Sequence, residues 1–271
     1  MMKTVIQVDP STPTHDTPLS DVVVIDDVFT ADECDALVSR AMNEVGFVPS
    51  KHKGKEDDGF RRSGRAPFTD AALARRIFER VEHRLPCTIR PDSMAITRIS
   101  AAHLGMEPRW GPPRGLWEEL RVLAYEKDDF FKPHWDNRCT VGQSSEFSDA
   151  ASFLTLLLYL NDRPSGGGGQ TRISCPPLDA SASELFGQYE GGTPTMGQVR
   201  NSTIAEVKPV TGRVLIFPHR LVHEGARVEG SSTKFVLRGD ILYAPPTGTG
   251  DKDEESEDAE DDPDCRRRRR R

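Results

Sequence analysis

A series of short apolar and β-branched segments after Pro86 constrains the fold more than any other feature of this sequence. Turn residues separate the segments, and many short strands at such spacing are typical of an antiparallel double sheet or barrel. The chain is therefore predicted to be mainly β. The predicted strands are residues 93–100, 120–125, 129–137, 152–162, 169–174, 203–210, 212–218 and 233–243.

Two helices are predicted before this series. Thr30 and Glu33 have the spacing of a capping box, which begins a helix that runs to about Glu44. A second helix is expected from about Asp70 to Leu85, because its apolar residues recur on one face. These patterns predict a mainly β (α+β) fold with supporting N-terminal helices at residues 30–85 and a further strand at 21–29.

The 271 residues allow one substantial domain or two small ones, and we assign one domain to residues 21–245 with its β core at about 93–245. Residues 1–20 are expected to form a flexible arm. Residues 246–271 combine an acidic run with six arginines and are predicted to be a disordered tail. The alternative for those arginines is a basic patch for localisation or anion binding. The charged residues 50–65 are expected to form an exposed loop, and 176–202 an inserted one.

Cysteine spacing and hydropathy indicate the compartment. The five cysteines are odd in number and lack a C-x-x-C pair, which is typical of free thiols in a reducing compartment. We find no signal-peptide core and no run of about 20 apolar residues. The protein is therefore expected to be soluble and intracellular, either cytoplasmic or nuclear, without a membrane partner.

Net charge argues against a nucleic-acid partner. The total is −7, and the last 21 residues contribute ten acidic and seven basic side chains, which leaves −4 on the rest. A body with this balance lacks the basic surface that nucleic-acid binding requires.

His134 and Asp136 are candidate metal ligands because residues i and i+2 of a strand point to the same face. Trp135 would point to the other face and pack between sheet and helices. A third ligand could be His219 or His223, and two histidines with one carboxylate suit non-haem Fe(II). The alternative is that each histidine is an ordinary hydrogen-bonded strand residue.

Several segments resemble the prolyl 4-hydroxylase-like family of Fe(II)/2-oxoglutarate-dependent dioxygenases. The resemblance covers about residues 21–245 and is most specific from Leu120 onward. It implies a double-stranded β-helix, or jelly roll, that binds Fe(2+) and uses 2-oxoglutarate and molecular oxygen as cosubstrates. The segments that carry it are "YEKDDFFKPHWDN", "FLTLLLYLND", "GGQT", "GRVLIFPHRLVHEG" and "TKFVLRGDILY".

The resemblance also implies roles for individual residues. His134 and Asp136 correspond to the first two iron ligands, and His223 corresponds to the third, with His219 as a competitor. Lys234, eleven residues after His223, would bind the far carboxylate of 2-oxoglutarate, and an anion there would offset the cost of burying a lysine.

Two further residues are candidates for the cosubstrate site. Arg238 lies on the same strand face as Lys234 and is the second candidate for the cosubstrate carboxylate; alternatively it pairs with a nearby acid. Tyr125 resembles the family tyrosine that hydrogen-bonds the cosubstrate, and its alternative is a tyrosine packed in the core.

The implied reaction is hydroxylation of a C–H bond, with a prolyl or other residue of a protein or peptide as the favoured substrate. The carboxylate of Asp136 favours hydroxylation over halogenation, in which a halide takes that position. The resemblance leaves ascorbate open as an additional cofactor.

Other functions stay open at this stage. They are a small-molecule or nucleic-acid oxygenase of the same superfamily, and a non-catalytic jelly-roll binding module. The segment "GFRRSGRAPF" (59–68) is expected to be a solvated loop, and its alternative is a lid whose arginines contact an acidic or polar substrate.

Overall fold

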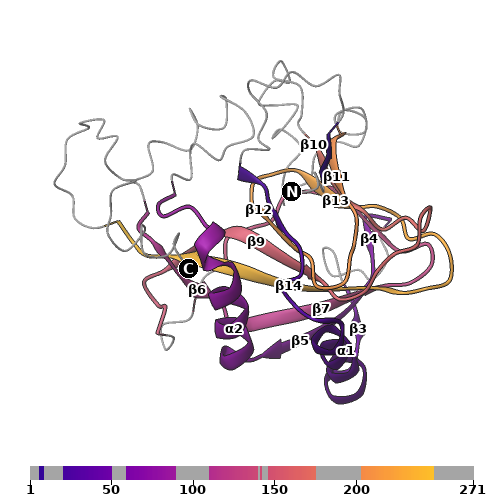
Figure 1. The fold of residues 1–271 in the computed structure, drawn as a ribbon, viewed down its shortest axis with the longest axis horizontal. Helices are drawn as coiled ribbons and strands as arrows, with labels where there is room; N and C mark the ends of the chain where they lie inside the picture. Colours follow the sequence, from indigo (N-terminus) through magenta and orange to yellow (C-terminus); the bar gives the residue numbers. More distant parts are fainter. Residues whose placement is uncertain are drawn as a thin grey trace.

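The structure, a computed structural model, describes residues 6–8, 21–50, 59–89, 110–139, 141, 146–174 and 203–246. Two antiparallel sheets form its centre (Figure 1). The larger has the order β2 (Val23–Ile25), β12 (Val214–Pro218), β9 (Ala151–Tyr159), β14 (Lys234–Tyr243), β7 (Glu119–Tyr125), β5 (Gly64–Thr69) and β3 (Val48–Pro49), and β6 (Pro113–Leu116) also pairs with β14. The smaller has the order β1 (Ile6–Val8), β11 (Thr203–Val207), β10 (Thr171–Ser174), β13 (His223–Gly225), β8 (Phe130–His134) and β4 (Arg61–Arg62).

The path of the chain from β7 to β14 identifies the fold. Strands β7, β9, β12 and β14 lie in the larger sheet, whereas β8, β10, β11 and β13 lie in the smaller one. Within the sheets these strands have the orders β12-β9-β14-β7 and β11-β10-β13-β8, so the chain crosses repeatedly between two four-stranded layers. This is the topology of a jelly roll, or double-stranded β-helix, and it confirms the predicted fold class.

Two helices support the larger sheet. Helix α1 (Ala31–Arg40) continues as a π-helical turn (Ala41–Val45), and α2 (Ala71–Val81) continues as a 3-10 turn (Glu82–Arg84). The predicted capping box is present, because Glu33 N donates to Thr30 Oγ1 at 3.2 Å and Thr30 N donates to Glu33 Oε2 at 3.0 Å. Figure 1 shows both helices beside the strands of the larger sheet. Both predicted helices are confirmed.

Alternation along the strands separates two hydrophobic cores. Leu156 and Leu158 of β9 face the helices and share a core with Ile77 of α2. The intervening Leu157 faces the other way and shares a second core with Ile173 of β10, between the two sheets. The period-2 geometry of a strand thus places every second side chain of the larger sheet in the space where the candidate ligands lie.

Gly212 fixes the turn that precedes β12. Its φ is +77°, and a Cβ there would lie 2.0 Å from the carbonyl oxygen of Phe29. The Gly212 carbonyl accepts hydrogen bonds from the backbone N–H groups of Val28 and Phe29 at 3.0 and 3.4 Å. Only glycine permits both this backbone conformation and this close approach.

The expectation of an exposed loop at residues 50–65 is wrong for the part that the structure describes. Residues 61–62 form β4, which pairs with β8, and residues 64–69 form β5, which pairs with β7. These two strands carry arginines and glycine in place of alternating apolar residues, so the pattern concealed them. Residues 51–58 lie outside the described part.

Other short strands also differ from the expectations. Strand β1 falls within the predicted arm and pairs with β11, and β3 and β6 had no sequence signal. The predicted strand at 93–100, the loop at 176–202 and the tail from 247 onward lie outside the described residues.

The cysteines follow the expectation in part. Cys34 and Cys139 are free thiols. Cys87 is disulfide-bonded, which corrects the prediction for that residue, because sequence spacing does not reveal which thiols are neighbours in space. In the part of the chain that is described, no helix has the length and hydropathy to cross a membrane.

Candidate metal centre

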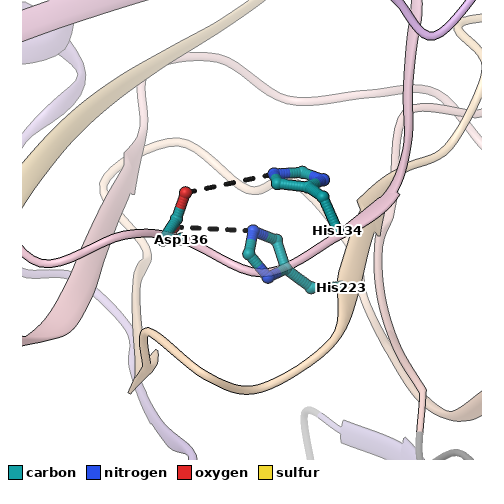
Figure 2. A group of neighbouring side chains, drawn as sticks. All are labelled: His134, Asp136 and His223. Carbon is teal, nitrogen blue, oxygen red and sulfur yellow. Dashed lines mark ion pairs between the residues drawn. The ribbon is translucent and has the colours of Figure 1, made fainter. Parts of the chain in front are cut away.

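The two candidate histidines lie opposite each other on paired strands of the smaller sheet. His134 is the last residue of β8, His223 is the first residue of β13, and the two are register partners. Asp136 follows two residues after the end of β8, where its backbone N–H donates to the carbonyl of His219 at 2.8 Å. Figure 2 shows the three side chains converging on one point.

Two distances within this group are short enough for the atoms to share a divalent ion. Nε2 of His134 lies 4.0 Å from Oδ1 of Asp136, and Nε2 of His223 lies 3.6 Å from Oδ2. One potential ligand atom of each residue lies within 4.8 Å of the others. Ligand atoms bound about 2.0–2.2 Å from one ion are separated by at most about 4.4 Å, so both measured pairs are compatible with a shared metal.

Backbone carbonyls fix the tautomer of both histidines. Nδ1 of His134 lies 2.7 Å from the carbonyl oxygen of Lys132, and Nδ1 of His223 lies 2.8 Å from that of Leu221. A carbonyl oxygen can only accept, so each Nδ1 carries the proton and each Nε2 presents a lone pair toward Asp136. Burial lowers the pKa of His223, which favours the neutral imidazole that a metal requires.

The carboxylate of Asp136 is held from two sides. Thr155 of β9 donates its hydroxyl to Oδ2 at 2.6 Å. Nη2 of Arg238 lies 3.1 Å from Oδ1 and 3.2 Å from Oδ1 of Asp240. These contacts fix the orientation of the carboxylate relative to the two histidines, as hydrogen-bond partners of metal ligands do.

We expect Thr155→Val to weaken metal binding by about tenfold or more, because the isosteric side chain cannot donate to Asp136. Thr211→Val is the matched control: the Thr211 hydroxyl also donates to an aspartate, Asp162, but at the surface. Equilibrium dialysis against Ni(II) measures both affinities. Equal affinities for the two variants would show that the Thr155 hydrogen bond does not position the ligand.

Lys234 is buried near the group without a carboxylate partner among the described residues. Its side chain is 3% exposed, and Nζ lies 5.1 Å from the ring centre of Tyr125 and 5.7 Å from that of Tyr159. Burial, together with the positive charge of Arg163, lowers the pKa of Lys234 to about 7. A buried lysine in such surroundings is costly unless an anion binds beside it.

One cavity of about 390 Å³ joins the metal-ligand group to Lys234 and Tyr125. It lies between the two sheets, because Tyr125 and Lys234 are cross-strand partners on the inner face of the larger one. Trp135 also lines this cavity and is not part of the core between the larger sheet and the helices, where it was expected to pack.

His219 and Arg238 lie close to the group but have other partners. Nε2 of His219 is 3.2 Å from Oδ1 of the buried Asp240, and His219 is not part of the metal-ligand group. Arg238 contacts Asp136 and Asp240. This agrees with the alternative role predicted for Arg238, in which it pairs with a nearby acid. Thr155 was not predicted from the sequence, although its alternation with Leu156 and Leu158 in the predicted strand places it on the inner face of β9.

Comparison with known families found one match. The profile of the 2OG-Fe(II) oxygenase superfamily matches residues 120–239, which include all three candidate ligands and Lys234. In this segment the chain is similar to the 2OG-Fe(II) oxygenase superfamily. The resemblance drawn from the sequence motifs is confirmed at this level. No curated protein is significantly similar to the chain in sequence.

Solved structures of similar fold include several 2OG-Fe(II) oxygenases. A viral collagen prolyl hydroxylase from Paramecium bursaria Chlorella virus-1 is 17% identical, with 82% of this chain and 96% of that one covered and a TM-score of 0.43. A Pseudomonas putida prolyl-4-hydroxylase is 16% identical, with 82% and 94% covered and a TM-score of 0.48. HygX from Streptomyces hygroscopicus, solved with nickel, 2-oxoglutarate and hygromycin B, is 18% identical, with 84% and 83% covered and a TM-score of 0.43. At these values the likenesses do not identify a substrate.

Proposed function

We propose that this chain is an Fe(II)- and 2-oxoglutarate-dependent dioxygenase that hydroxylates a C–H bond of a prolyl or other residue in a protein or peptide. The observation that carries the proposal is the convergence of His134, Asp136 and His223 inside the segment that matches the superfamily, with both Nδ1 atoms bound to backbone carbonyls. Two histidines and one carboxylate leave open positions on Fe(II) for a cosubstrate and oxygen. The preference for a peptide substrate rests on the family resemblance of the sequence motifs.

Each residue then has a defined task. Bound Fe(II) together with 2-oxoglutarate supplies the oxidation of a C–H bond by molecular oxygen. His134, Asp136 and His223 hold the metal, while the Thr155 hydroxyl orients the carboxylate. Lys234 binds the far carboxylate of 2-oxoglutarate, and the buried surroundings strengthen that ion pair because they exclude water.

Lys234 is a better partner for the cosubstrate than Arg238. Arg238 already contacts two carboxylates, whereas no acid among the residues described pairs with Lys234. Tyr125 lies directly across from Lys234 and forms a wall of the same cavity. A purely structural jelly-roll binding module has no need of a buried lysine at this place, so Lys234 also favours an enzyme over such a module.

Two finer points remain predictions from the sequence. These are ascorbate as an additional cofactor and an intracellular location. Oxidation of a small molecule or of nucleic acid is the alternative substrate class within the superfamily.

Anaerobic binding followed by oxygen exposure tests the proposal. The wild-type protein should bind Fe(II) and 2-oxoglutarate without oxygen and release succinate when oxygen is added, even without the primary substrate. His134→Ala should release only background succinate, because one ligand of the metal is lost. If the wild type releases no more succinate than this variant, the enzyme assignment is wrong.

A further inference from the structure

The segment from Arg61 to Arg65 crosses between the two sheets beside the metal centre. Strand β4 extends the smaller sheet, with Arg61 opposite Phe131, three residues before the first ligand histidine. Strand β5 extends the larger sheet, with Arg65 opposite Leu123, whose side chain faces the space between the sheets. Both arginine side chains line the cavity that contains the candidate ligands.

This cavity carries a large excess of positive charge. Its basic lining residues are Arg61, Arg65, Arg121, Arg138, Lys234 and Arg238, and its acidic ones are Asp136 and Glu224. Asp136 is a candidate metal ligand, and Glu224 is 3.1 Å from Nη1 of Arg172. A bound divalent metal would add to the excess, so the free space near it has a positive potential that attracts anions.

Several of the basic residues are already engaged. Arg121 and Arg238 are cross-strand partners, and both contact Asp240, at 3.6 and 3.2 Å. The guanidinium of Arg138 lies 4.4 Å from the ring centre of Phe153. Lys234 has the cosubstrate as its proposed partner. Of the basic residues that line the cavity, this leaves Arg61 and Arg65, and neither forms an ion pair with a carboxylate of the described residues.

Contacts on one side hold the guanidinium of Arg61 in place. Its Nε donates to Ser63 Oγ at 3.1 Å, Ser63 Oγ donates to Ser50 Oγ at 3.0 Å, and Arg61 Cζ lies 4.4 Å from the ring centre of Phe131. Burial lowers the pKa of Arg61, with opposing contributions from Tyr125 and Asp136. A half-buried, oriented guanidinium without a carboxylate is ready to pair with one, because its fork geometry matches an oxyanion.

Arg61 and Lys234 share Tyr125 as a neighbour but lie on different sheets. Lys234 belongs to β14 of the larger sheet, whereas Arg61 belongs to β4 of the smaller sheet and lies over the ring of Phe131. The Phe131 ring stacks on the ring of His134, with 3.5 Å between ring centres, so Arg61 is on the side of the cavity that carries the candidate metal ligands. An anion that pairs with Arg61 would lie beside the metal centre without occupying the position of the cosubstrate carboxylate.

We propose that Arg61, with Arg65 at the outer end, binds an anionic group of the primary substrate, a carboxylate or a phosphate, next to the C–H bond that is oxidised. The proposal rests on the dioxygenase function proposed above and narrows its substrate to molecules that carry an oxyanion near the target bond. It also gives "RRSGR" a role as a charged edge of the site, in place of a solvated loop.

A binding experiment with capped amino acids tests this without knowledge of the natural substrate. The protein is loaded with Ni(II) and saturated with 2-oxoglutarate, and binding of N-acetylated, amidated glutamate, glutamine and phosphoserine is measured by ligand-observed NMR. We expect the wild type to bind glutamate or phosphoserine at least about tenfold more tightly than glutamine, since a charge-assisted hydrogen bond is lost with the amide. The tighter of the two anions identifies carboxylate or phosphate as the recognised group.

Variants at the edge of the site identify the residues responsible. Arg61→Gln should remove the preference for the anion and leave 2-oxoglutarate affinity unchanged. Arg65→Glu, at an exposed position, should also weaken anion binding. This variant tests the proposal if Arg61→Gln does not fold. Arg75→Gln, on the exposed face of α2, is the control and should bind like the wild type.

The outcomes separate this proposal from the function on which it rests. Equal anion affinity in wild type, Arg61→Gln and Arg65→Glu would overturn it, as would a wild type that binds 2-oxoglutarate but prefers neither anion to glutamine. Loss of 2-oxoglutarate binding in Arg61→Gln would assign Arg61 to the cosubstrate. A wild type that binds neither Ni(II) nor 2-oxoglutarate would instead overturn the dioxygenase function itself.

Discussion

Replacement of His223 by alanine should lower Fe(II) affinity by more than about 100-fold, the upper limit for loss of a residue that only supports a ligand. His223 presents Nε2 toward Asp136 because its Nδ1 is committed to the carbonyl of Leu221. Without this imidazole, only His134 and Asp136 of the candidate group would remain to hold the ion. Anaerobic titration with Fe(II), or equilibrium dialysis against Ni(II), measures the loss.

His219→Ala is the matched control, because this histidine is the sequence competitor for the same role. It is as buried as His223, but its ring faces Asp240 and not the metal-ligand group. We expect it to retain metal binding and to reduce stability, since it removes a buried partner of Asp240. If His223→Ala keeps its metal while His219→Ala loses it, the ligand assignment is reversed.

Replacement of Lys234 by methionine should reduce 2-oxoglutarate affinity by about two orders of magnitude while metal affinity changes little, because breaking a buried charge pair costs several kcal/mol. Methionine retains the unbranched chain and the packing against Tyr125 and Tyr159, so the variant removes the charge and little else. Calorimetric titration of the Ni(II)-loaded protein with 2-oxoglutarate gives the cosubstrate affinity, and equilibrium dialysis against Ni(II) gives the metal affinity. Unchanged 2-oxoglutarate affinity would exclude Lys234 from the cosubstrate site.

The pH dependence of the same titration provides a second check. In the cosubstrate-free protein the pKa of Lys234 is lowered to about 7, so its ammonium is increasingly lost above that pH. Binding of a carboxylate requires the charged form, and the affinity for 2-oxoglutarate should therefore fall by about tenfold per pH unit above pH 7. Lys234→Arg should remove this dependence, because arginine stays protonated throughout the range. A wild-type affinity that is constant between pH 7 and 9 would contradict the assignment.

The strands with continuous apolar runs were predictable, and the strands that carry arginines were not. β9 and β12 present apolar residues to both faces, so their place at the centre of a sheet follows from composition alone. β4 and β5 expose arginines, and only their pairing with β8 and β7 makes them strands. Pairing is a long-range property, which a local pattern does not encode.

The candidate site was predictable where its geometry is local. His134 and Asp136 are neighbours in sequence, so their proximity needed only a short extended segment. The choice between His219 and His223 depends on how the chain turns after β12. In that turn the backbone N–H of His219 donates to the carbonyl of Phe153, and the imidazole of His219 lies beside Asp240. The partners of Arg238 likewise depend on the register of β14 against β7, which no sequence spacing reveals.

The pairing of β8 with β13 means that the metal would join two points of the chain that are distant in sequence but adjacent in the sheet. The register of His134 and His223 is set by that pair of strands and not by the length of chain between them. Insertions or deletions between the ligands can therefore accumulate without moving the metal. Evolution can change which molecules reach the centre through these connections while the chemistry at the centre stays the same.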